Sequence, residues 1–481
     1  MFEFNNLGEI TDLREGLYWS KEQLLKEIAN RTEILKRENI GSGAKVFITH
    51  GGTPQFFADL FAVWSLGACA LCVNETTTQS ELTNLVQFVE PELILFRGEK
   101  PTLGINRAVP MFDITHSKAS TSLPSRPPHS DDDCALILFT SGSTGDPKGV
   151  VHTSRSICER LLQNQRWLPT DILRNTLCLL PTHFGHGLIG NTLTALTAGA
   201  HLFLLPNPGV DGLARLGKTI DENRISFMSS VPAMWKVATR ISTSPVLGSL
   251  KQINIGSAPL AKSLWDAVVG WSDGAEVVNM YGITETANWF GGASSKTYQT
   301  EDGLVGVPWG GEAAVFTPEG NIERYGNGEL LLATPSVMSG YLKRPDLTAE
   351  VLKDGWYFTG DRGEIDTNGV IRLTGRLKTQ INRAGEKILP EEIDLLLEQH
   401  PAIDEACAFG VPDPIQGEAV GIALCANRQV SEIELRNWCT ERIRGYCIPE
   451  KWFFVDTIPK TERGKVQRAN VRQYCLEKED G

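Results

Sequence analysis

The chain reads Thr140-Ser-Gly-Ser-Thr-Gly-Asp-Pro-Lys-Gly149 directly after an apolar run, Cys134 to Phe139, that predicts a buried strand. The glycines let backbone N–H groups turn toward an anion, the serines and threonines add hydroxyl donors, and Lys148 adds positive charge. The stretch therefore predicts a phosphate-binding loop, with an ordinary polar surface loop as the alternative. Its spacing is not Gly-x-x-x-x-Gly-Lys-Ser/Thr, so a P-loop NTPase is not predicted.

Apolar runs alternate with amphipathic stretches on both sides of this loop. The pattern predicts strands over 45–49, 69–73, 93–96, 177–180 and 201–205. It predicts helices over 54–65, 80–89, 154–167 and 188–196. Such alternation is typical of a layered α/β architecture. A different pattern begins after the turn at Gly375-Arg376, with a helix predicted over 390–399, so we expect a domain boundary near residues 375–380.

Length and charge narrow the class of protein. The chain has 481 residues, more than one hydrophobic core usually holds, so two or more domains are expected. A net charge of −12 without a long basic stripe argues against general binding to nucleic acid or anionic membranes. No stretch approaches the roughly 20 apolar residues of a membrane span, and the first residues lack the layout of a signal peptide. We expect a cytoplasmic protein with reduced, mostly buried cysteines.

Six further motifs follow one another along the chain: Gly256-Ser-Ala-Pro259, Asn279-Met-Tyr-Gly-Ile-Thr-Glu285, Tyr357-Phe-Thr-Gly-Asp361, Gly375-Arg-Leu-Lys-Thr379, Gly385-Glu-Lys-Ile-Leu-Pro-Glu-Glu-Ile393 and Pro459-Lys-Thr-Glu-Arg-Gly-Lys465. Together with the phosphate loop, they make almost the whole chain resemble the adenylate-forming superfamily of AMP-binding enzymes. This superfamily comprises acyl- and aryl-CoA synthetases, adenylation domains and firefly-type luciferases.

The resemblance implies an α/β fold with two domains. A large N-terminal domain of layered α/β subdomains would occupy residues 1–377 and bind ATP and the carboxylate. A small mobile α+β C-terminal domain would occupy residues 378–481 and carry the catalytic lysine. Lys378 would be the hinge between them.

The resemblance also implies the residues of an ATP site. Tyr281 would pack against adenine, Thr284 would contact phosphate, and Glu285 would bind Mg²⁺, an ion that prefers hard oxygen ligands. Asp361 would accept hydrogen bonds from the ribose hydroxyls, and Arg376 would contact ribose or phosphate. The other nucleotide-binding residues that it implies are Thr140, Ser141, Gly142, Ser143, Thr144, Gly145, Lys148, Gly256, Ser257, Ala258, Pro259, Asn279, Met280 and Gly282.

Lys465 would act with Thr284 and Glu285 in catalysis. In the family this lysine bridges the α-phosphate of ATP and the substrate carboxylate, two anions whose repulsion positive charge offsets. The acyl group then passes from the adenylate to a thiol, either of CoA or of the phosphopantetheine of a carrier protein. Ala384 and Gly385 lie where CoA-using relatives often have two glycines beside the thiol channel. No carrier domain follows residue 470, so we expect any carrier to be a separate protein.

The acid is predicted from Pro181-Thr-His-Phe-Gly-His-Gly187 and from Trp289. Amino-acid adenylation domains carry an Asp where this chain has Gly185, so an α-amino acid is not expected, because its buried ammonium would lack a partner. CoA synthetases commonly carry a histidine where this chain has Phe184. We expect an aryl or short-to-medium acyl acid in a pocket lined by His183 or Phe184 and shortened by Trp289. A core position is the alternative for this tryptophan.

Three alternatives concern metal and function. His183 and His186 have the spacing of metal ligands, but no third ligand is evident, so zinc is not expected. Luciferase-like oxidation of the adenylate would need an oxidisable substrate. A catalytically silent nucleotide-binding protein would form no adenylate, and the retained Lys148, Glu285 and Lys465 count against it.

Overall fold

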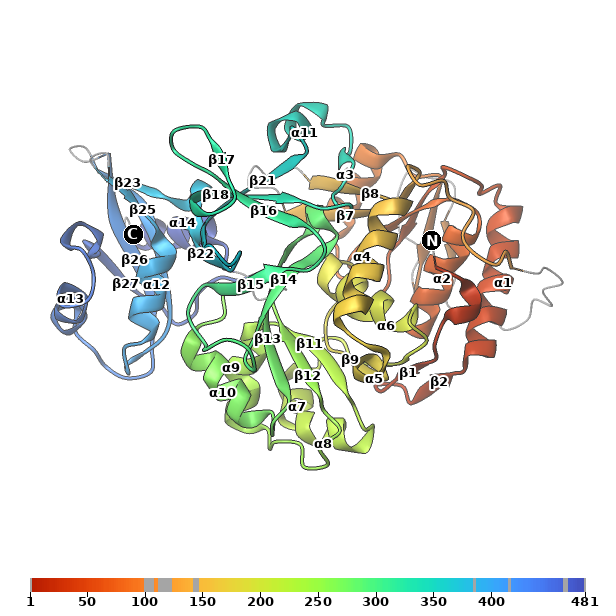
Figure 1. The fold of residues 1–481 in the computed structure, drawn as a ribbon, viewed down its shortest axis with the longest axis horizontal. Helices are drawn as coiled ribbons and strands as arrows, with labels where there is room; N and C mark the ends of the chain where they lie inside the picture. Colours follow the sequence, from red (N-terminus) through yellow and green to blue (C-terminus); the bar gives the residue numbers. More distant parts are fainter. Residues whose placement is uncertain are drawn as a thin grey trace. The chain divides into compact units, whose positions relative to one another are not determined.

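The computed structural model in Figure 1 describes residues 2–98, 108–110, 123–141, 147–383, 386–413, 417–461 and 466–479. The chain divides into two compact units. Unit 1 comprises Met1–Thr300, Val307–Glu312 and Ala333–Tyr357, and unit 2 comprises Glu301–Gly306, Ala313–Leu332 and Phe358–Gly481. The domain boundary expected between residues 377 and 378 stays a prediction.

In the described part of unit 1, one sheet has seven strands in the order β19-β8-β7-β4-β3-β5-β6. Neighbours from β7 to β6 run parallel, whereas β8 is antiparallel to β7 and β19 is antiparallel to β8. The strands are β3 (Lys45–Ile48), β4 (Cys69–Cys72), β5 (Leu93–Phe96), β6 (Ala108–Pro110), β7 (Cys134–Ser141), β8 (Pro147–Thr153) and β19 (Gly340–Tyr341).

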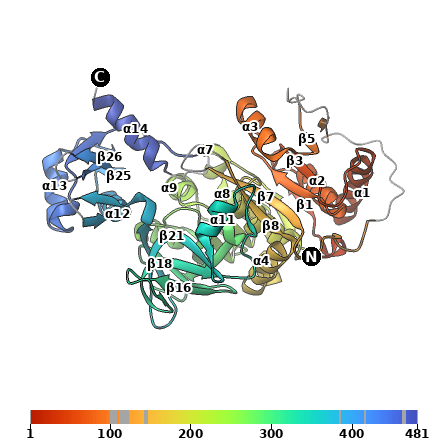
Figure 2. The same cartoon turned by 90° about the horizontal axis from the view of Figure 1, so that it is seen from above.

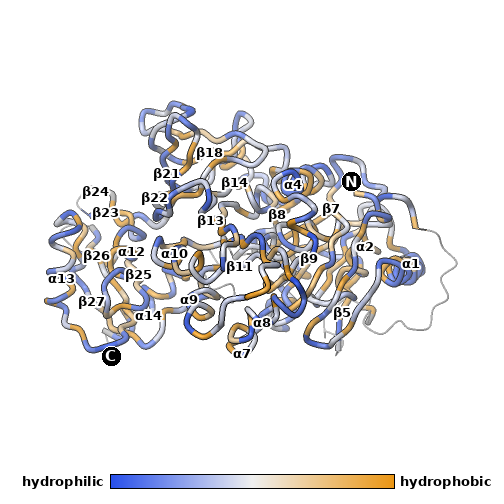
Figure 3. Tube along the Cα trace, turned by 60° about the horizontal axis from the view of Figure 1, so that its bottom comes forward, coloured by the Kyte–Doolittle hydropathy of each residue, from blue (hydrophilic) through white to orange (hydrophobic). Residues whose placement is uncertain are grey.

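Helices cover this sheet in layers. Helix α2 (Pro54–Ser65) is buried along its whole length, because it lies between strands β3 and β4 and helix α1 (Lys21–Arg37) (Figure 2). Figure 3 shows hydrophobic residues along the central strands and a mostly hydrophilic α1. The remaining elements near this sheet are α3 (Gln79–Val89), α11 (Pro345–Val351), β20 (Leu352–Lys353) and the short helix η1 (Phe4–Asn6).

The second sheet of unit 1 follows the order β14-β13-β12-β11-β9-β10-β1-β2. Strands from β13 to β1 are parallel, so their carboxyl ends lie at one edge, where the motifs at Gly256 and Asn279 begin or end. The strands are β1 (Ile10–Asp12), β2 (Leu17–Trp19), β9 (Asn175–Cys178), β10 (His201–Leu204), β11 (Phe227–Ser230), β12 (Gln252–Ile255), β13 (Glu276–Ile283) and β14 (Asn288–Ser294). The helices are α4 (Ser154–Trp167), α5 (Thr170–Leu173), η2 (His186–Leu193), α6 (Thr194–Leu196), α7 (Gly209–Ala214), α8 (Leu216–Glu222), α9 (Pro232–Ile241), α10 (Lys262–Trp271) and η3 (Thr284–Thr286).

The predicted α/β alternation is confirmed, with two local differences. The strand expected over 177–180 lies at Asn175–Cys178, because pairing with β10 and β11 selects these residues. The helix expected over 188–196 begins at His186 and is a π-helix up to Leu193. There, the hydroxyls of Thr192 and Thr194 donate to carbonyl groups five residues earlier in the chain, which supports the wider turn.

Unit 2 contains two groups of strands. The first follows the order β17-β16-β18-β21-β22-β15, and the second follows β24-β23-β26-β25 with β27 beside β26. Helix α12 packs on β25 over an apolar core. Strands β15, β16, β18 and β21 each include residues that are assigned to unit 1. The elements are β15 (Leu304–Pro308), β16 (Glu312–Phe316), β17 (Ile322–Glu323), β18 (Gly326–Ala333), β21 (Trp356–Ile365), β22 (Ile371–Arg376), η4 (Leu377–Thr379), β23 (Ile381–Arg383), β24 (Glu386–Ile388), α12 (Pro390–Glu398), β25 (Ile403–Asp413), β26 (Gly417–Ala426), α13 (Glu432–Thr440), η5 (Gly445–Cys447), β27 (Lys451–Phe454) and α14 (Arg468–Glu479).

The ten cysteines carry free thiols, and most of them are buried. Within the described ranges, no helix combines the length and the hydrophobicity that crossing a membrane requires.

Candidate nucleotide-binding site

The predicted phosphate loop joins two antiparallel strands of the seven-stranded sheet. Thr140 in β7 lies directly opposite Lys148 in β8, so the hairpin fixes both ends of the loop. The ammonium of Lys148 lies 5.5 Å from the centre of the Tyr341 ring, a cation–π contact. Gly142, Ser143, Thr144 and Gly145 lie outside the described residues, and only the backbone of Ser141 is described. The phosphate contacts of these residues stay predictions.

The same tyrosine contacts the predicted magnesium ligand. Thr284 and Glu285 open the short helix η3, directly after β13. The hydroxyl of Tyr341 lies 2.8 Å from Oε1 of Glu285 and 3.4 Å from the hydroxyl of Tyr357. Burial and the nearby charge of Glu285 raise the pKa of both tyrosines. Tyr341 therefore stays a neutral donor to the carboxylate at physiological pH.

Glu285 has the features of a carboxylate that binds Mg²⁺ together with phosphate. Its side chain is half-buried, and Oε1 is held by Tyr341. It forms no ion pair with any residue that the structure describes. Mg²⁺ in nucleotide sites is typically held by one or two carboxylates, phosphate oxygens and water. Glu285 therefore fits this ion. Among the described residues, no group of three or more His, Cys, Asp or Glu side chains could hold a metal ion by itself.

The two motifs predicted to border adenine approach each other at the ends of β12 and β13. A Cβ added at Gly256 would lie 3.2 Å from Met280 Cβ, so the two backbones are close. Ser257 has a φ of +69°, in the left-handed region, and turns the chain after β12. Tyr281 and Asn279 are buried, at 6% and 4% exposed. The structure therefore brings the predicted adenine residues to one edge of the sheet.

The remaining residues of these two motifs differ in exposure and contact. Ala258 is half-buried and Pro259 is exposed. A Cβ at Gly282 would lie 2.2 Å from the carbonyl oxygen of Asn288, so a side chain at this position would force the backbone apart. A β-bulge between Tyr281 and Gly282 accompanies this close approach.

In unit 2, the two predicted ribose residues form an ion pair. Asp361 in β21 lies opposite Arg376 in β22, and Arg376 Nε is 2.7 Å from Asp361 Oδ1. The carboxylate of Asp361 is 5% exposed and the guanidinium side chain 46% exposed. The backbone N–H of Asp361 also donates to the hydroxyl of Thr359 at 2.9 Å. The sequence predicted each residue separately and did not predict their pairing.

Four more of the predicted residues lie where the structure describes no side chain. Lys378 lies in the short helix η4, where only its backbone is described. Ala384, Gly385 and Lys465 lie outside the described residues. The hinge, the thiol channel and the catalytic lysine stay predictions.

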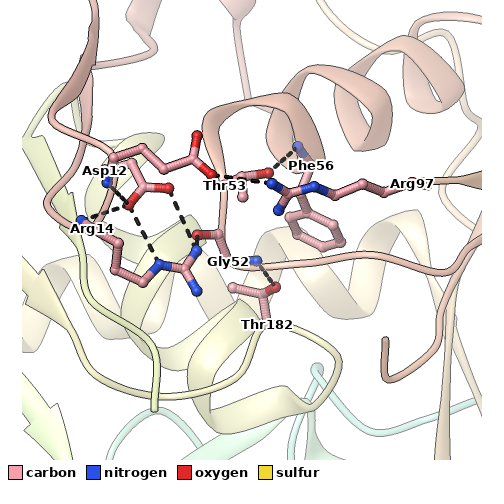
Figure 4. A network of polar contacts seen from close by, with 8 residues as sticks. Asp12, Arg14, Gly52, Thr53, Phe56, Arg97 and Thr182 are labelled. Atoms are coloured by element: carbon pink, nitrogen blue, oxygen red, sulfur yellow. Dashed lines mark hydrogen bonds and ion pairs between the residues drawn. The ribbon is translucent and has the colours of Figure 1, made fainter. Parts of the chain in front are cut away.

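The motif from Pro181 to Gly187 is anchored to the N-terminal segment. The hydroxyl of Thr182 accepts a hydrogen bond from the N–H of Gly52 at 2.9 Å, and Arg14 donates to the carbonyl of Gly52 at 2.8 Å. Figure 4 shows that Arg14 also reaches Asp12 on β1, and that Arg97 lies in the same network. The contacts of Gly52 with Thr182 and Arg14 join residues far apart in sequence, and no local pattern signals them.

His186 connects this motif to the turn at Ser257. Its ring is 2% exposed; Nδ1 lies 2.8 Å from the Ser257 hydroxyl and Nε2 lies 2.5 Å from the Ser229 hydroxyl. Burial lowers the pKa of His186 to about 3, so the ring is neutral at physiological pH. In the sequence, His186 stands out only by its metal-ligand spacing with His183. The structure instead shows it between the hydroxyls of the buried Ser229 and the exposed Ser257.

Trp289 lies in an aromatic cluster beside His186. The ring is 1% exposed, and its centre is 5.7 Å from the centre of His186, 6.3 Å from Phe227 and 6.4 Å from Trp309. A Cβ added at Gly190 would lie 3.0 Å from this tryptophan ring, so the π-helix packs closely on it. Trp289 is a core side chain; that it also bounds the acid pocket stays a prediction.

The other two predicted pocket residues are adjacent to this cluster. Phe184 is buried, at 6% exposed, and its ring centre lies 6.5 Å from that of His186. His183 is half-buried, with its ring 5.7 Å from Phe184. The structure thus brings Phe184, His186 and Trp289 into one region.

Known proteins match the chain over nearly its full length. Oxalate–CoA ligase of Arabidopsis thaliana is 29% identical, over 95% of this chain and 92% of that protein. Fatty acid–[acyl-carrier-protein] ligase ScoC of Streptomyces coeruleorubidus is 29% identical, over 96% of this chain and 92% of that protein. The crystal structure of ATP-bound MatB from Rhodopseudomonas palustris superposes with a TM-score of 0.87 at 23% identity, over 97% and 95% of the two chains.

Two family profiles cover most of the sequence. The profile of the AMP-binding enzyme matches residues 9–342, and that of the AMP-binding enzyme C-terminal domain matches residues 392–465. The predicted combination of a large N-terminal and a small C-terminal domain with an α/β fold is confirmed, as is the resemblance to the adenylate-forming superfamily. The chain belongs to the AMP-binding enzyme family.

Proposed function

We propose that this chain is an acid–thiol ligase that activates a carboxylic acid with ATP. A carboxylate oxygen attacks the α-phosphorus, pyrophosphate leaves, and an acyl-adenylate forms. A thiol sulfur then attacks the acyl carbon, and AMP leaves. The observation that carries this proposal is the near full-length match to ligases that join acids to CoA or to a carrier protein.

The nucleotide-side residues have chemistry that suits the first step. Lys148 contacts the face of the Tyr341 ring, and this contact leaves the N–H donors of its ammonium for phosphate oxygens. Glu285 would hold Mg²⁺, which supplies positive charge to the phosphates when bound. Tyr281 is proposed to contact adenine, and Asp361 and Arg376 to contact ribose. Lys465 is proposed to bridge the α-phosphate and the carboxylate.

The class of acid is proposed from the residues of the predicted acid pocket. The two relatives act on acids as different as oxalate and a fatty acid, so likeness alone does not select a substrate. Gly185 supplies no charge for a substrate ammonium, which argues against an α-amino acid. The buried ring of Trp289 beside His186 favours an aryl or short-to-medium acyl acid. CoA and a separate carrier protein are both proposed acceptors.

We also propose where the enzyme acts in the cell and which part of it moves. We expect a cytoplasmic enzyme whose C-terminal domain, from residue 378 onward, moves about Lys378 between the two half-reactions. Lys465 would act in the first half-reaction, and the segment containing Ala384 and Gly385 would act in the second.

The function is tested by exchange of labelled pyrophosphate into ATP over a panel of acids. An adenylating enzyme gives exchange only with its own acid, whereas a protein that only binds nucleotide gives none. Addition of CoA or of a carrier protein then identifies the acceptor by the thioester formed. Light emission or oxygen uptake with the activated acid would instead support the luciferase-like alternative.

The catalytic lysine is tested in the same assay. Lys465→Ala should lower exchange at least about 100-fold, because a transition-state charge contact is lost, while ATP binding largely remains. The matched control is Lys460→Ala, since Lys460 pairs with Glu405 and has no proposed catalytic role. Unchanged exchange in Lys465→Ala would remove the assignment.

A further inference from the structure

Tyr341 contacts two oppositely charged residues that belong to different motifs. Its hydroxyl lies 2.8 Å from Oε1 of Glu285, and its ring centre lies 5.5 Å from the ammonium of Lys148. These two charged groups form no ion pair with each other, although both contact the same side chain. Tyr341 itself is 8% exposed and belongs to none of the motifs that predicted the nucleotide site.

The backbone around Tyr341 is bonded to both charged segments. Tyr341 pairs with Val150 in β8, and the N–H of Leu342 donates to the carbonyl of Gly149, next to Lys148, at 2.8 Å. The N–H of Met338 donates to the carbonyl of Glu285 at 2.7 Å. The segment 338–342 therefore links the strand after the phosphate loop to the predicted magnesium ligand.

A glycine and a threonine fix the direction of this segment. Gly340 has a φ of +150°, and a Cβ at this position would lie 2.8 Å from Thr348 Cγ2. The hydroxyl of Thr348 accepts a hydrogen bond from the N–H of Tyr341 at 2.9 Å. The backbone of Tyr341 is thus held on both of its sides.

The contacts of Tyr341 with Glu285 and Lys148 orient each charge without cancelling it. A neutral phenol donates to one carboxylate oxygen, so Glu285 keeps its full negative charge for a cation, which an arginine or lysine partner would offset. The ring face attracts the ammonium of Lys148 but uses none of its N–H donors. A direct pair between Glu285 and Lys148 would consume both groups, and the tyrosine provides each with another partner.

We propose that Tyr341 is a positioning residue that keeps Glu285 and Lys148 apart and aimed at MgATP. Its hydroxyl orders the carboxylate that holds Mg²⁺, and its ring orders the lysine that holds phosphate. This inference rests on the proposed function for the identity of the ligand, and it adds a residue with two separable tasks.

The two tasks are separated by two substitutions and a binding assay. Binding of labelled ATP is measured by equilibrium dialysis, first with EDTA and then over a series of Mg²⁺ concentrations. Tyr341→Phe removes only the hydroxyl, so ATP binding in EDTA should equal wild type, while the Mg²⁺ concentration for half-maximal enhancement rises about tenfold. Tyr341→Leu also removes the ring, so binding in EDTA should itself weaken about threefold to tenfold.

The matched control is Tyr18→Phe, which removes an exposed tyrosine hydroxyl that donates to Glu9 at 2.5 Å. It should match wild type in both conditions. The same Mg²⁺ dependence in Tyr341→Phe as in wild type would overturn the proposal, and so would loss of ATP binding by Tyr341→Phe in EDTA. These binding results do not depend on turnover. Failure of the proposed function would appear as absent pyrophosphate exchange in wild type, so it can be told apart from failure of the role proposed for Tyr341.

Discussion

Glu285 and His186 differ in whether their contacts within the protein leave their polar atoms available to a ligand. Glu285 and Lys148 are half-buried, and a neutral tyrosine orders them without neutralising them. His186 is fully buried, and both of its ring nitrogens already contact serine hydroxyls of the protein. The first region keeps charge available for a ligand, whereas the second uses its polar groups internally. We infer that charge defines the nucleotide side and that shape defines the acid side.

The largest effect is expected where charge is kept available. Glu285→Gln keeps the size of the side chain but removes its negative charge, so acid-dependent pyrophosphate exchange should fall about 100-fold to 1,000-fold. Exchange at saturating ATP and acid over a Mg²⁺ series measures this loss. Glu301→Gln is the control, because Glu301 pairs with Arg372 at the surface. A loss of less than about threefold in Glu285→Gln would erase the contrast between the two regions.

A smaller effect is expected where shape decides. Trp289→Leu should lower the free energy of unfolding by about 3 kcal/mol, because it leaves space in a packed aromatic cluster. If Trp289 shortens the acid pocket, kcat/KM for longer acids should rise about tenfold relative to shorter ones. Trp265→Leu, also at a fully buried tryptophan, should lose stability without a change in acid preference. An unchanged preference in Trp289→Leu would assign this ring to the core alone.

The smallest effect concerns the buried neutral histidine. The pKa of His186 is about 3 in the folded chain, below the ordinary value of 6.5. Below pH 6.5 the ring is therefore protonated in the unfolded chain but stays neutral in the folded chain. His186 therefore destabilises the folded state increasingly as the pH falls from 6.5 toward 3, and has no such effect above that window. His186→Gln removes this pH-dependent destabilisation, although it lowers the free energy of unfolding at pH 7.

Urea unfolding at several pH values measures the difference between wild type and His186→Gln. The stability advantage of wild type should be constant above pH 7 and should shrink below pH 6.5, by up to about 1.4 kcal/mol per pH unit. His152, buried with a pKa of about 4, is present in both proteins and cancels in the difference. A constant advantage down to pH 4.5 would show that His186 takes up its proton in the folded chain.

Local sequence signals predicted much of the fold. Helices α2 and α4 and strand β5 lie at the predicted residues, and threonine N-caps at Thr53 and Thr153 mark where both helices begin. Strand β9 and the π-helix differ because their limits depend on partners. Pairing of Thr176 with Phe227 extends β9 into polar sequence, which hydrophobic periodicity does not indicate.

The candidate site divides in the same way. Residues inside contiguous motifs, such as Thr284 and Glu285, could be proposed as site residues from the sequence because the family pattern is local in sequence. The link from Tyr341 to Glu285 spans 56 residues, and that from His186 to Ser257 spans 71. Contacts of this kind depend on the packing of separate strands and helices, so a single sequence without aligned relatives carries no signal for them.

We expect MgATP to bind at the edge formed by the ends of β12 and β13. A crystal structure of the protein with ATP and Mg²⁺ should show adenine against Tyr281 and a metal ion bound to the carboxylate of Glu285, with the Tyr341 hydroxyl still donating to its other oxygen. Nucleotide density away from Tyr281, or a metal ion without Glu285 among its ligands, would show that MgATP does not bind there.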